Sequence, residues 1–290
     1  GTIAAATIDA GAGADTLYFA AAATGSRING GADSDTLIFA NTIFTASVSG
    51  GDGSDSLSFG STVSASTLTG GSGNDTFLVN TLSNSYVSGD TGVDLVSITG
   101  ALIGSEINLG SGDEAFTLTV DSTTSTIFGG DDKDTLIFSS TLTSSSVGGG
   151  SGNDLISFLR VVGVGNTING GAGNDTLIFS STVSAASILG QAGDDSFSFG
   201  NTLTGVTLNA GDGTDTISLA VNVTGSYLSL DAGSDLLIFA TSTTLTSSSV
   251  LGGADNDTLS FLGTVGTSTI DAGAGADSLY FALGATATNI

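Results

Sequence analysis

The sequence predicts an all-β fold, a right-handed parallel β-solenoid with about 20 residues per coil and roughly 14 coils. Three observations predict it. A glycine-rich acidic loop returns about every 20 residues, apolar residues keep fixed positions relative to that loop, and the 290 residues include no proline. Helix is hard to fit into any part of this pattern.

The acidic loop is seen most clearly at Gly170–Asp175, which reads Gly-Gly-Ala-Gly-Asn-Asp. A short fixed period means that each unit can bury its apolar face only against its neighbours, so we expect residues 1–290 to form one elongated domain. The chain starts at Gly1 without Met, and Ile290 lies where a fifteenth unit would begin, so we expect a segment of a longer chain. The closing acids of the fourteen loops are Asp15, Asp35, Asp55, Asp75, Asp94, Glu114, Asp134, Asp154, Asp175, Asp195, Asp215, Asp235, Asp257 and Asp277.

The residues after each acid alternate as in a strand. Thr176-Leu177-Ile178-Phe179 places Leu177 and Phe179 on one face. Further apolar columns fall at the start of each unit, as at Ile168, and after a Ser/Thr-rich turn, as at Val183. Four inward columns on two short strands per coil predict a flattened coil. Ten phenylalanines lie four positions after the acid: Phe19, Phe39, Phe59, Phe138, Phe158, Phe179, Phe199, Phe239, Phe261 and Phe281.

Neighbouring coils should lie about 4.8 Å apart, with strands one period apart paired in parallel. Parallel crossovers are nearly always right-handed, which sets the expected handedness. The absence of proline agrees with this prediction, because a ladder needs almost every backbone N–H.

Composition excludes several kinds of partner. The formal charge is −25 and the hydrophobic content is 39%, which is too apolar for a disordered acidic tail. Arg27, Lys133 and Arg160 are the only basic residues, which argues against binding to nucleic acid or to an anionic membrane surface. No apolar run is long enough for a membrane helix, so we expect no membrane insertion. Any charged partner should be cationic.

The loops carry the chemistry of a hard cation site. Repeated glycine allows positive φ and turns carbonyl oxygens toward one point, where aspartate adds a carboxylate. Oxygen ligands without His or Cys select Ca²⁺, Mg²⁺ or Mn²⁺, and calcium suits six to eight flexible oxygens best. Stacked carboxylates about 5 Å apart repel by roughly 3 kcal/mol at an effective dielectric of 20. One Ca²⁺ in each of the thirteen gaps between loops would add +26 against the charge of −25.

Gly-Gly-x-Gly-x-Asp-x-apolar resembles the RTX, or haemolysin-type, calcium-binding repeat, and the resemblance covers residues 8–290. It implies an exported protein with an RTX-like β-roll, in which loops of adjacent coils share calcium through Asp side chains and glycine-loop carbonyls. The number of ions expected is several, up to about one per gap. The ligands implied are Asp15, Asp35, Asp55, Asp75, Asp94, Asp134, Asp154, Asp175, Asp195, Asp215, Asp235, Asp257 and Asp277, with carbonyls of residues such as Gly31, Gly51, Gly71, Gly150 and Gly171.

The chain departs from the usual RTX pattern in two ways. Family nonapeptides follow one another directly and supply loops on both edges, whereas here only one edge carries them and the opposite edge is rich in Ser and Thr. In addition, Glu114 replaces Asp and the preceding unit is one residue short, which weakens the expectation of metal around residues 89–114. The alternative interpretation of all the loops is Gly/Asp turn chemistry without metal.

Function follows from the array. The chain has no His, no Cys and a single Lys, so we predict that it is not an enzyme. The first hypothesis is a structural, extracellular calcium-binding segment of a surface layer, filament or adhesin, which folds on meeting external calcium and self-associates. The alternatives are an ice-binding calcium solenoid and the RTX tail of a larger secreted enzyme.

Overall fold

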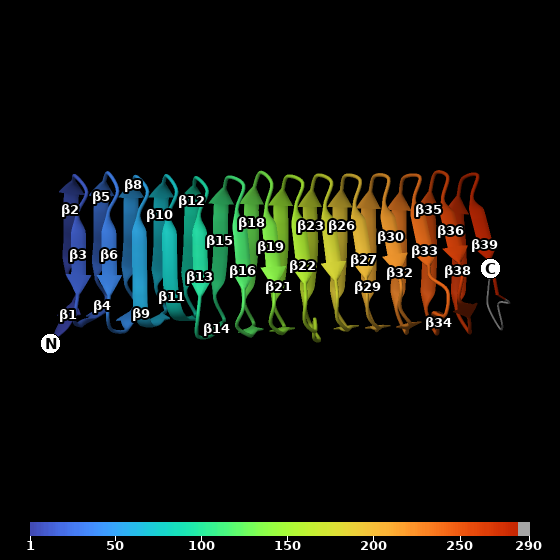
Figure 1. Cartoon of the computed structure of the whole chain (residues 1–290), viewed down its shortest axis with the longest axis horizontal. Coiled ribbons are helices and arrows are strands. Elements are labelled where there is room, and N and C mark those ends of the chain that lie inside the picture. Colours follow the sequence, from blue (N-terminus) through green and yellow to red (C-terminus); the bar gives the residue numbers. More distant parts are fainter. Residues whose placement is uncertain (284–290) are drawn as a thin grey trace. The chain divides into compact units, whose positions relative to one another are not determined.

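The structure is a computed structural model that describes residues 1–283. It consists of two compact units, Gly1–Ser140 and Thr141–Ile290, each a parallel β-solenoid of seven coils (Figure 1). The prediction of one domain stays a prediction, and the expected fifteenth unit at Ile290 lies outside the described residues. Residues 1–283 form no helix, and therefore none that could cross a membrane.

In the first unit each coil has a six-residue strand before the acidic loop and a second strand after it. The first strands are β2 (Thr7–Ala12), β5 (Arg27–Ala32), β8 (Ser47–Asp52), β10 (Thr67–Ser72), β12 (Tyr86–Thr91), β15 (Glu106–Ser111) and β18 (Thr126–Asp131). The second strands are β3 (Thr16–Phe19), β6 (Thr36–Phe39), β9 (Ser56–Ser64), β11 (Thr76–Ser83), β13 (Leu95–Ile98), β16 (Ala115–Leu118) and β19 (Thr135–Phe138).

The second unit repeats this plan. Its first strands are β21 (Ser146–Ser151), β23 (Thr167–Ala172), β26 (Ser187–Ala192), β29 (Thr207–Asp212), β32 (Tyr227–Ala232), β35 (Ser249–Ala254) and β38 (Thr269–Ala274). Its second strands are β22 (Leu155–Phe158), β24 (Thr176–Phe179), β27 (Ser196–Phe199), β30 (Thr216–Leu219), β33 (Leu236–Phe239), β36 (Thr258–Phe261) and β39 (Ser278–Phe281).

A third short strand follows in most coils, which corrects the prediction of two strands per coil. It lies at the Ser/Thr-rich edge, where too few alternating residues stand between turns to be seen as a strand in the sequence. In the first unit it forms β1 (Thr2–Ala4), β4 (Ala22–Thr24), β7 (Ile43–Phe44), β14 (Leu102–Ile103) and β17 (Ser122–Thr123), and it is fused to the second strand in β9 and β11. In the second unit it forms β20 (Leu142–Thr143), β25 (Val183–Ser184), β28 (Leu203–Thr204), β31 (Val223–Thr224), β34 (Thr244–Thr246) and β37 (Thr264–Val265).

Strands of successive coils pair in parallel and in register, as predicted. In the β23–β26 pair Ile168 faces Ile188, and in the β24–β27 pair Phe179 faces Phe199. Identical positions therefore stack on one another inside each unit. This alignment turns the period of the sequence into continuous columns of like side chains.

The predicted apolar columns form the core. Phe19, Phe39 and Phe59 stack with ring centroids 4.6 and 5.0 Å apart, and Phe158, Phe179 and Phe199 do the same at 5.0 and 4.8 Å. Such offset aromatic pairs are worth about 1 kcal/mol each beyond their burial. The fourth column after the Ser/Thr-rich turn is buried and includes Leu82 and Leu245, while Ser122 takes the position that is in register with Leu102.

A second polar column runs along the Ser/Thr-rich edge inside the turns. The hydroxyl of Ser66 accepts the N–H of Ala46 at 3.1 Å and donates to the carbonyl of Ser64 at 2.8 Å. The same arrangement recurs from coil to coil, and the side chains are buried. Hydroxyls such as those of Ser85, Ser105 and Ser226 thus satisfy one inward N–H and one carbonyl of a turn. The hydroxyl column consists of Ser26, Ser66, Ser85, Ser105, Ser125, Ser145, Ser226, Ser248 and Ser268.

Every member of the hydroxyl column lies nine residues before the acid of its coil. This distance is constant in all fourteen coils, while the path from an acid to the next column position varies from ten residues (Asp75 to Ser85) to thirteen (Asp235 to Ser248). Asn166 takes the position in one coil. It has no hydroxyl, but its Oδ1 accepts a hydrogen bond from the N–H of Ser145 at 2.8 Å. The position is apolar at Ala6, Ala46, Ala186 and Val206.

Filling a gap in the hydroxyl column should stabilise its unit. Ala46→Ser is expected to raise the free energy of unfolding by about 1 kcal/mol, because Ser26 N–H would gain the acceptor that Ala46 cannot supply. Ser66→Ala is expected to cost about 1–3 kcal/mol, since it leaves the buried N–H of Ala46 unpaired. Thermal unfolding with calcium present measures both changes. Ser64→Ala, whose side chain lies outside the column, is the control, and equal effects of Ser64→Ala and Ser66→Ala would contradict the assignment.

Candidate metal column

The acidic loops close each coil at the edge that lies uppermost in Figure 1. Each loop joins a first strand to a second strand, for example β23 to β24, and its closing Asp side chain turns into the end of the core. Asp175, Asp195 and Asp215 are buried, with no more than 2% of their surface exposed. The backbone N–H of Asp175 donates to Oδ1 of Asp195 at 2.7 Å, and Asp195 N–H donates to Oδ1 of Asp215 at 2.7 Å. The carboxylates therefore form a ladder in which the Oδ1 atom of each coil accepts the Asp N–H of the coil before it.

The second oxygen of these carboxylates has no such partner. Oδ2 is buried and accepts no hydrogen bond from the described residues in Asp15, Asp35, Asp55, Asp75, Asp94, Asp175, Asp195, Asp215, Asp235 and Asp257. A buried anionic oxygen without a hydrogen-bond donor is costly. Because the same oxygen lacks a donor in ten coils, all ten coils need positive charge at the same place. A cation bound at this oxygen would meet the requirement.

A backbone carbonyl of the next coil faces the same point. A methyl group added at Gly30 would lie 2.5 Å from Oδ2 of Asp35 and 2.5 Å from the carbonyl oxygen of Gly50. At Gly170 the corresponding distances are 2.5 Å to Oδ2 of Asp175 and 3.0 Å to the carbonyl oxygen of Gly190. Two acceptors thus crowd one position with no donor between them. Among residues 1–283 no three acidic side chains converge, so a metal here would be bound by one or two carboxylates together with carbonyl oxygens.

The glycines whose carbonyl oxygens the sequence predicts as metal ligands lie one residue further along the loop. Gly31, Gly51, Gly71, Gly150 and Gly171 have φ between 117° and 122°, and a side chain at Gly171 would collide with the carbonyl of Gly150. These five glycines supply the backbone conformation of the loop. The carbonyl near Oδ2 belongs to the residue before them, such as Gly50, Gly70 or Gly170, and metal binding by the carbonyls of the five predicted glycines stays a prediction. In other coils Leu109, Ala210 and Ala272 supply the equivalent carbonyl, so no single residue type marks this position in the sequence.

Burial raises the pKa of the carboxyls in nine coils: Asp55, Asp75, Asp94, Glu114, Asp175, Asp195, Asp215, Asp235 and Asp257. The shift is opposed by the hydrogen bond from the preceding coil and increased by neighbouring carboxylates. The pKa rises from 3.8 to about 7 for Asp75, Asp175, Asp195 and Asp235, and to about 6 for Asp94 and Asp215. Without a metal, the folded column therefore opposes ionisation of its own ligands.

The ladder breaks between Asp94 and Glu114. Asp75 N–H still donates to Oδ1 of Asp94 at 2.7 Å, so the coil that is one residue short keeps its place. Asp94 N–H has no hydrogen bond to Glu114, and β13 and β16 do not pair within the described chain. Burial and the neighbouring Asp134 raise the pKa of Glu114. The break in the carboxylate ladder thus lies at the Asp-to-Glu replacement rather than at the shortened coil, and weaker metal binding around residues 89–114 stays a prediction.

Glu114→Asp should restore the hydrogen-bond ladder between the coils of Asp94 and residue 114. The shorter side chain is expected to bring a carboxylate oxygen to Asp94 N–H and to add one bound calcium ion per chain. Calorimetric titration of the metal-free chain counts the ions. Glu106→Asp, at an exposed outward position, is the matched control. An unchanged ion count for Glu114→Asp would show that the gap between Asp94 and Glu114 is blocked for another reason.

The comparisons with known proteins agree with this geometry. The family model of the RTX calcium-binding nonapeptide repeat matches four times, at residues 1–21, 64–80, 165–180 and 251–285. The chain carries RTX calcium-binding repeats. Their buried, donor-free Oδ2 atoms and facing carbonyls fit the oxygen ligands that calcium prefers. Comparison with curated proteins gives no match.

A solved structure shares the fold. It is described as a hyperactive, Ca²⁺-dependent, β-helical antifreeze protein from an Antarctic bacterium. The similarity has a TM-score of 0.60 and 18% sequence identity, and covers 92% of this chain and 80% of that chain. At this identity the likeness concerns the solenoid fold alone.

Proposed function

We propose that this RTX solenoid is a structural, extracellular segment of a surface layer, filament or adhesin that folds when it meets external calcium. The observation that carries the proposal is the repeated buried carboxylate with one satisfied and one donor-free oxygen. Calcium bound between neighbouring coils, up to one ion per gap, supplies the missing positive charge. The ligands are the Asp residues of the column and the carbonyls that face them.

The calcium dependence suits a secreted protein. Low cytosolic calcium leaves the carboxylates to repel one another, whereas extracellular modules bind calcium in the range of about 10⁻⁴ to 10⁻³ M. The chain would therefore leave the cell unfolded and form coils outside. Folding driven by binding in this way couples stability directly to the calcium concentration.

Outward side chains on the second strands supply surfaces for self-association. In the first unit Tyr18 and Leu78 are 64% and 45% exposed on β3 and β11, and in the second unit Tyr280 is 56% exposed on β39. Large apolar side chains exposed on a flat sheet are common at protein contacts. We assign the contacts between copies to this face.

Electron microscopy of the native protein, with calcium and after chelation, tests the proposal. A sheet or filament that disappears with calcium is the expected result. Leu78→Ser should weaken the assembly while the far-UV circular dichroism of the chain stays unchanged. Isolated rods that never associate would argue for a stalk or for the RTX tail of a larger secreted enzyme.

Ice binding is the second candidate, because the structural neighbour is an antifreeze protein. An ice-binding surface needs a regular rank of like residues, and the exposed loop positions here are mixed, as Asp52, Asp131 and Ala172 show. The measurement is thermal hysteresis of the calcium-loaded chain, which we expect to be absent. A clear hysteresis would favour ice binding over the structural role.

A further inference from the structure

A tyrosine occurs at one outward position in the fifth coil of each unit. Tyr86-Val87-Ser88-Gly89-Asp90 in β12 corresponds to Tyr227-Leu228-Ser229-Leu230-Asp231 in β32. In both, the serine hydroxyl donates to its aspartate, whose φ is positive. The other twelve coils have no aromatic residue at the tyrosine position: Thr7, Arg27, Ser47, Thr67, Glu106, Thr126, Ser146, Thr167, Ser187, Thr207, Ser249 and Thr269.

Each tyrosine lies in an open groove along the outside of the hydroxyl edge. The groove around Tyr227 has a volume of about 640 Å³ and runs across four successive coils, from Gly205–Thr207 to Thr267–Thr269. The groove around Tyr86 occupies the same coil positions in the first unit and has a volume of about 460 Å³. Both volumes fall in the range of sites for small ligands. The same groove is thus built twice, once in each unit.

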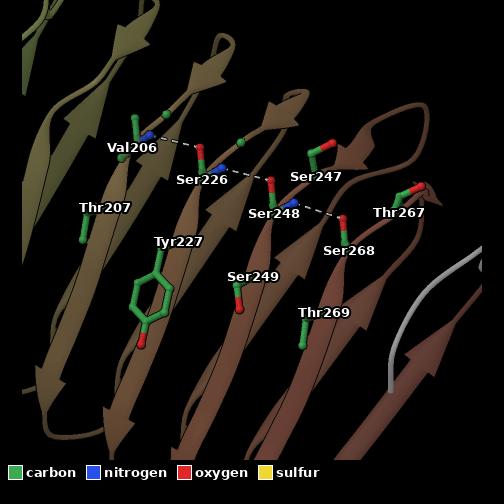
Figure 2. A pocket seen from close by; sticks show the side chains of 12 residues that line it. Val206, Thr207, Ser226, Tyr227, Ser247, Ser248, Ser249, Thr267, Ser268 and Thr269 are labelled. Atoms are coloured by element: carbon green, nitrogen blue, oxygen red, sulfur yellow. Dashed lines mark hydrogen bonds between the residues drawn. The ribbon is translucent and has the colours of Figure 1, made fainter.

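The Tyr227 groove combines one aromatic ring with hydroxyl groups. Tyr227 is 42% exposed, and Figure 2 shows its ring face on, between the side chains of Thr207 and Ser249. The hydroxyls of Ser226 and Ser248 at the groove floor already serve the hydroxyl column. The outer hydroxyls have no hydrogen-bond partner among residues 1–283, and they remain available to a ligand: Thr207, Ser247, Ser249, Thr267 and Thr269.

Charge narrows the class of ligand. All twelve residues that line the Tyr227 groove are neutral, and the only charged residue lining the Tyr86 groove is Glu106. The net charge of −25 and the absence of any basic side chain from both grooves disfavour phosphate, sulfate and other anions. An apolar peptide side chain would leave the ring of surrounding hydroxyls without partners.

We propose that the two tyrosine grooves bind neutral saccharide chains. A sugar ring has an apolar face of C–H groups, which would pack on the tyrosine ring, and equatorial hydroxyls, which would exchange hydrogen bonds with the Ser and Thr side chains along the groove. The open groove passes from coil to coil and admits a polymer at either end. This site is separate from the metal column and depends on calcium only through the folding of the coils.

The test is affinity electrophoresis of the calcium-loaded chain in native gels that contain a neutral β-glucan, dextran or a galactomannan, with heparin as the anionic comparison. We expect at least one neutral polysaccharide to retard the chain and heparin to leave it unaffected. Titration calorimetry with an oligosaccharide of the retarding polymer should give two sites per chain. Tyr227→Ala should leave one site, and Tyr86→Ala combined with Tyr227→Ala should weaken binding at least tenfold, while Tyr227→Phe keeps it.

Phe128→Ala is the matched control, because Phe128 is an exposed aromatic residue on the first strand β18 and lines neither groove. Retardation by none of the neutral polymers overturns the proposal, as does unchanged binding by the double variant or an equal loss in Phe128→Ala. Analytical ultracentrifugation of the same variants measures whether the tyrosine substitutions change self-association. A double variant that loses only self-association would identify the grooves as contacts between copies and would also overturn the saccharide assignment.

Discussion

Removal of calcium by excess chelator near neutral pH is expected to abolish most of the β structure of the RTX solenoid. The second unit has six gaps between neighbouring Asp residues of the column, and each gap would lose a cation that offsets roughly 3 kcal/mol of repulsion. Binding at a calcium concentration 100 times Kd contributes about 2.7 kcal/mol per site, so several sites together exceed the stability of an ordinary domain. Far-UV circular dichroism and thermal unfolding measure the loss, and readdition of calcium should reverse it.

Asp175→Asn separates the charge from the hydrogen bond. The amide oxygen can still accept the N–H of Asp154, which Oδ1 of Asp175 now accepts at 2.8 Å, but the ligand charge is lost. With calcium, we expect this variant to be less stable and to bind fewer ions. Without calcium, it should be more stable than the parent, because one buried charge is gone. Stability that changes in the same direction under both conditions would contradict a calcium role for Asp175.

The metal-free chain is expected to gain β structure on acidification. The pKa of Asp75, Asp175 and Asp195 is about 7 in the folded coils against an ordinary 3.8, so the folded state binds more protons between these values. Its stability is therefore greatest below about pH 4 and falls as pH rises through about 7. Each unit of pKa shift corresponds to roughly 1.4 kcal/mol for an isolated group. Circular dichroism of the chelated chain, recorded from neutral to acidic pH, measures the effect.

Calcium should reverse this pH dependence. With the sites filled, protons compete with the metal for the same oxygens, and acidification should lower the apparent calcium affinity. The chelated chain and the calcium-loaded chain thus change in opposite directions over the same pH interval. A metal-free chain that shows no gain of structure on acidification would mean that buried carboxylates do not limit its folding.

The acidic loop of each coil and the strand after it could be predicted well from the sequence. Phe179 and Asp175 recur at fixed positions, and in-register stacking is the only arrangement that buries every copy of both, so the core and the carboxylate column follow directly. The carbonyl that faces Oδ2 could not be assigned, because the two adjacent glycines Gly170 and Gly171 look alike in sequence and differ only in φ. Direct contact between the metal and the proposed ligands stays a prediction.

The hydroxyl column escaped sequence analysis for a different reason. Ser66 and Ser85 stand among many other Ser and Thr residues, and the spacing between successive members changes with coil length. What identifies a member of the hydroxyl column is that it lies nine residues before the acid of its coil. This regularity can be seen only when positions are counted back from the acids. The third strand, as at Ile43–Phe44, was missed because two residues carry no detectable alternation.

The fixed distance between the hydroxyl column and the acid divides every coil into two parts with different freedom to change. The nine residues that join the columns must keep their number, because one added residue would displace one column against its neighbours. The remainder of the coil already varies in length while both columns stay in register. Insertions of surface peptides are therefore confined to one side of each coil, where a lineage can diversify what the protein displays while the side that binds metal stays unchanged.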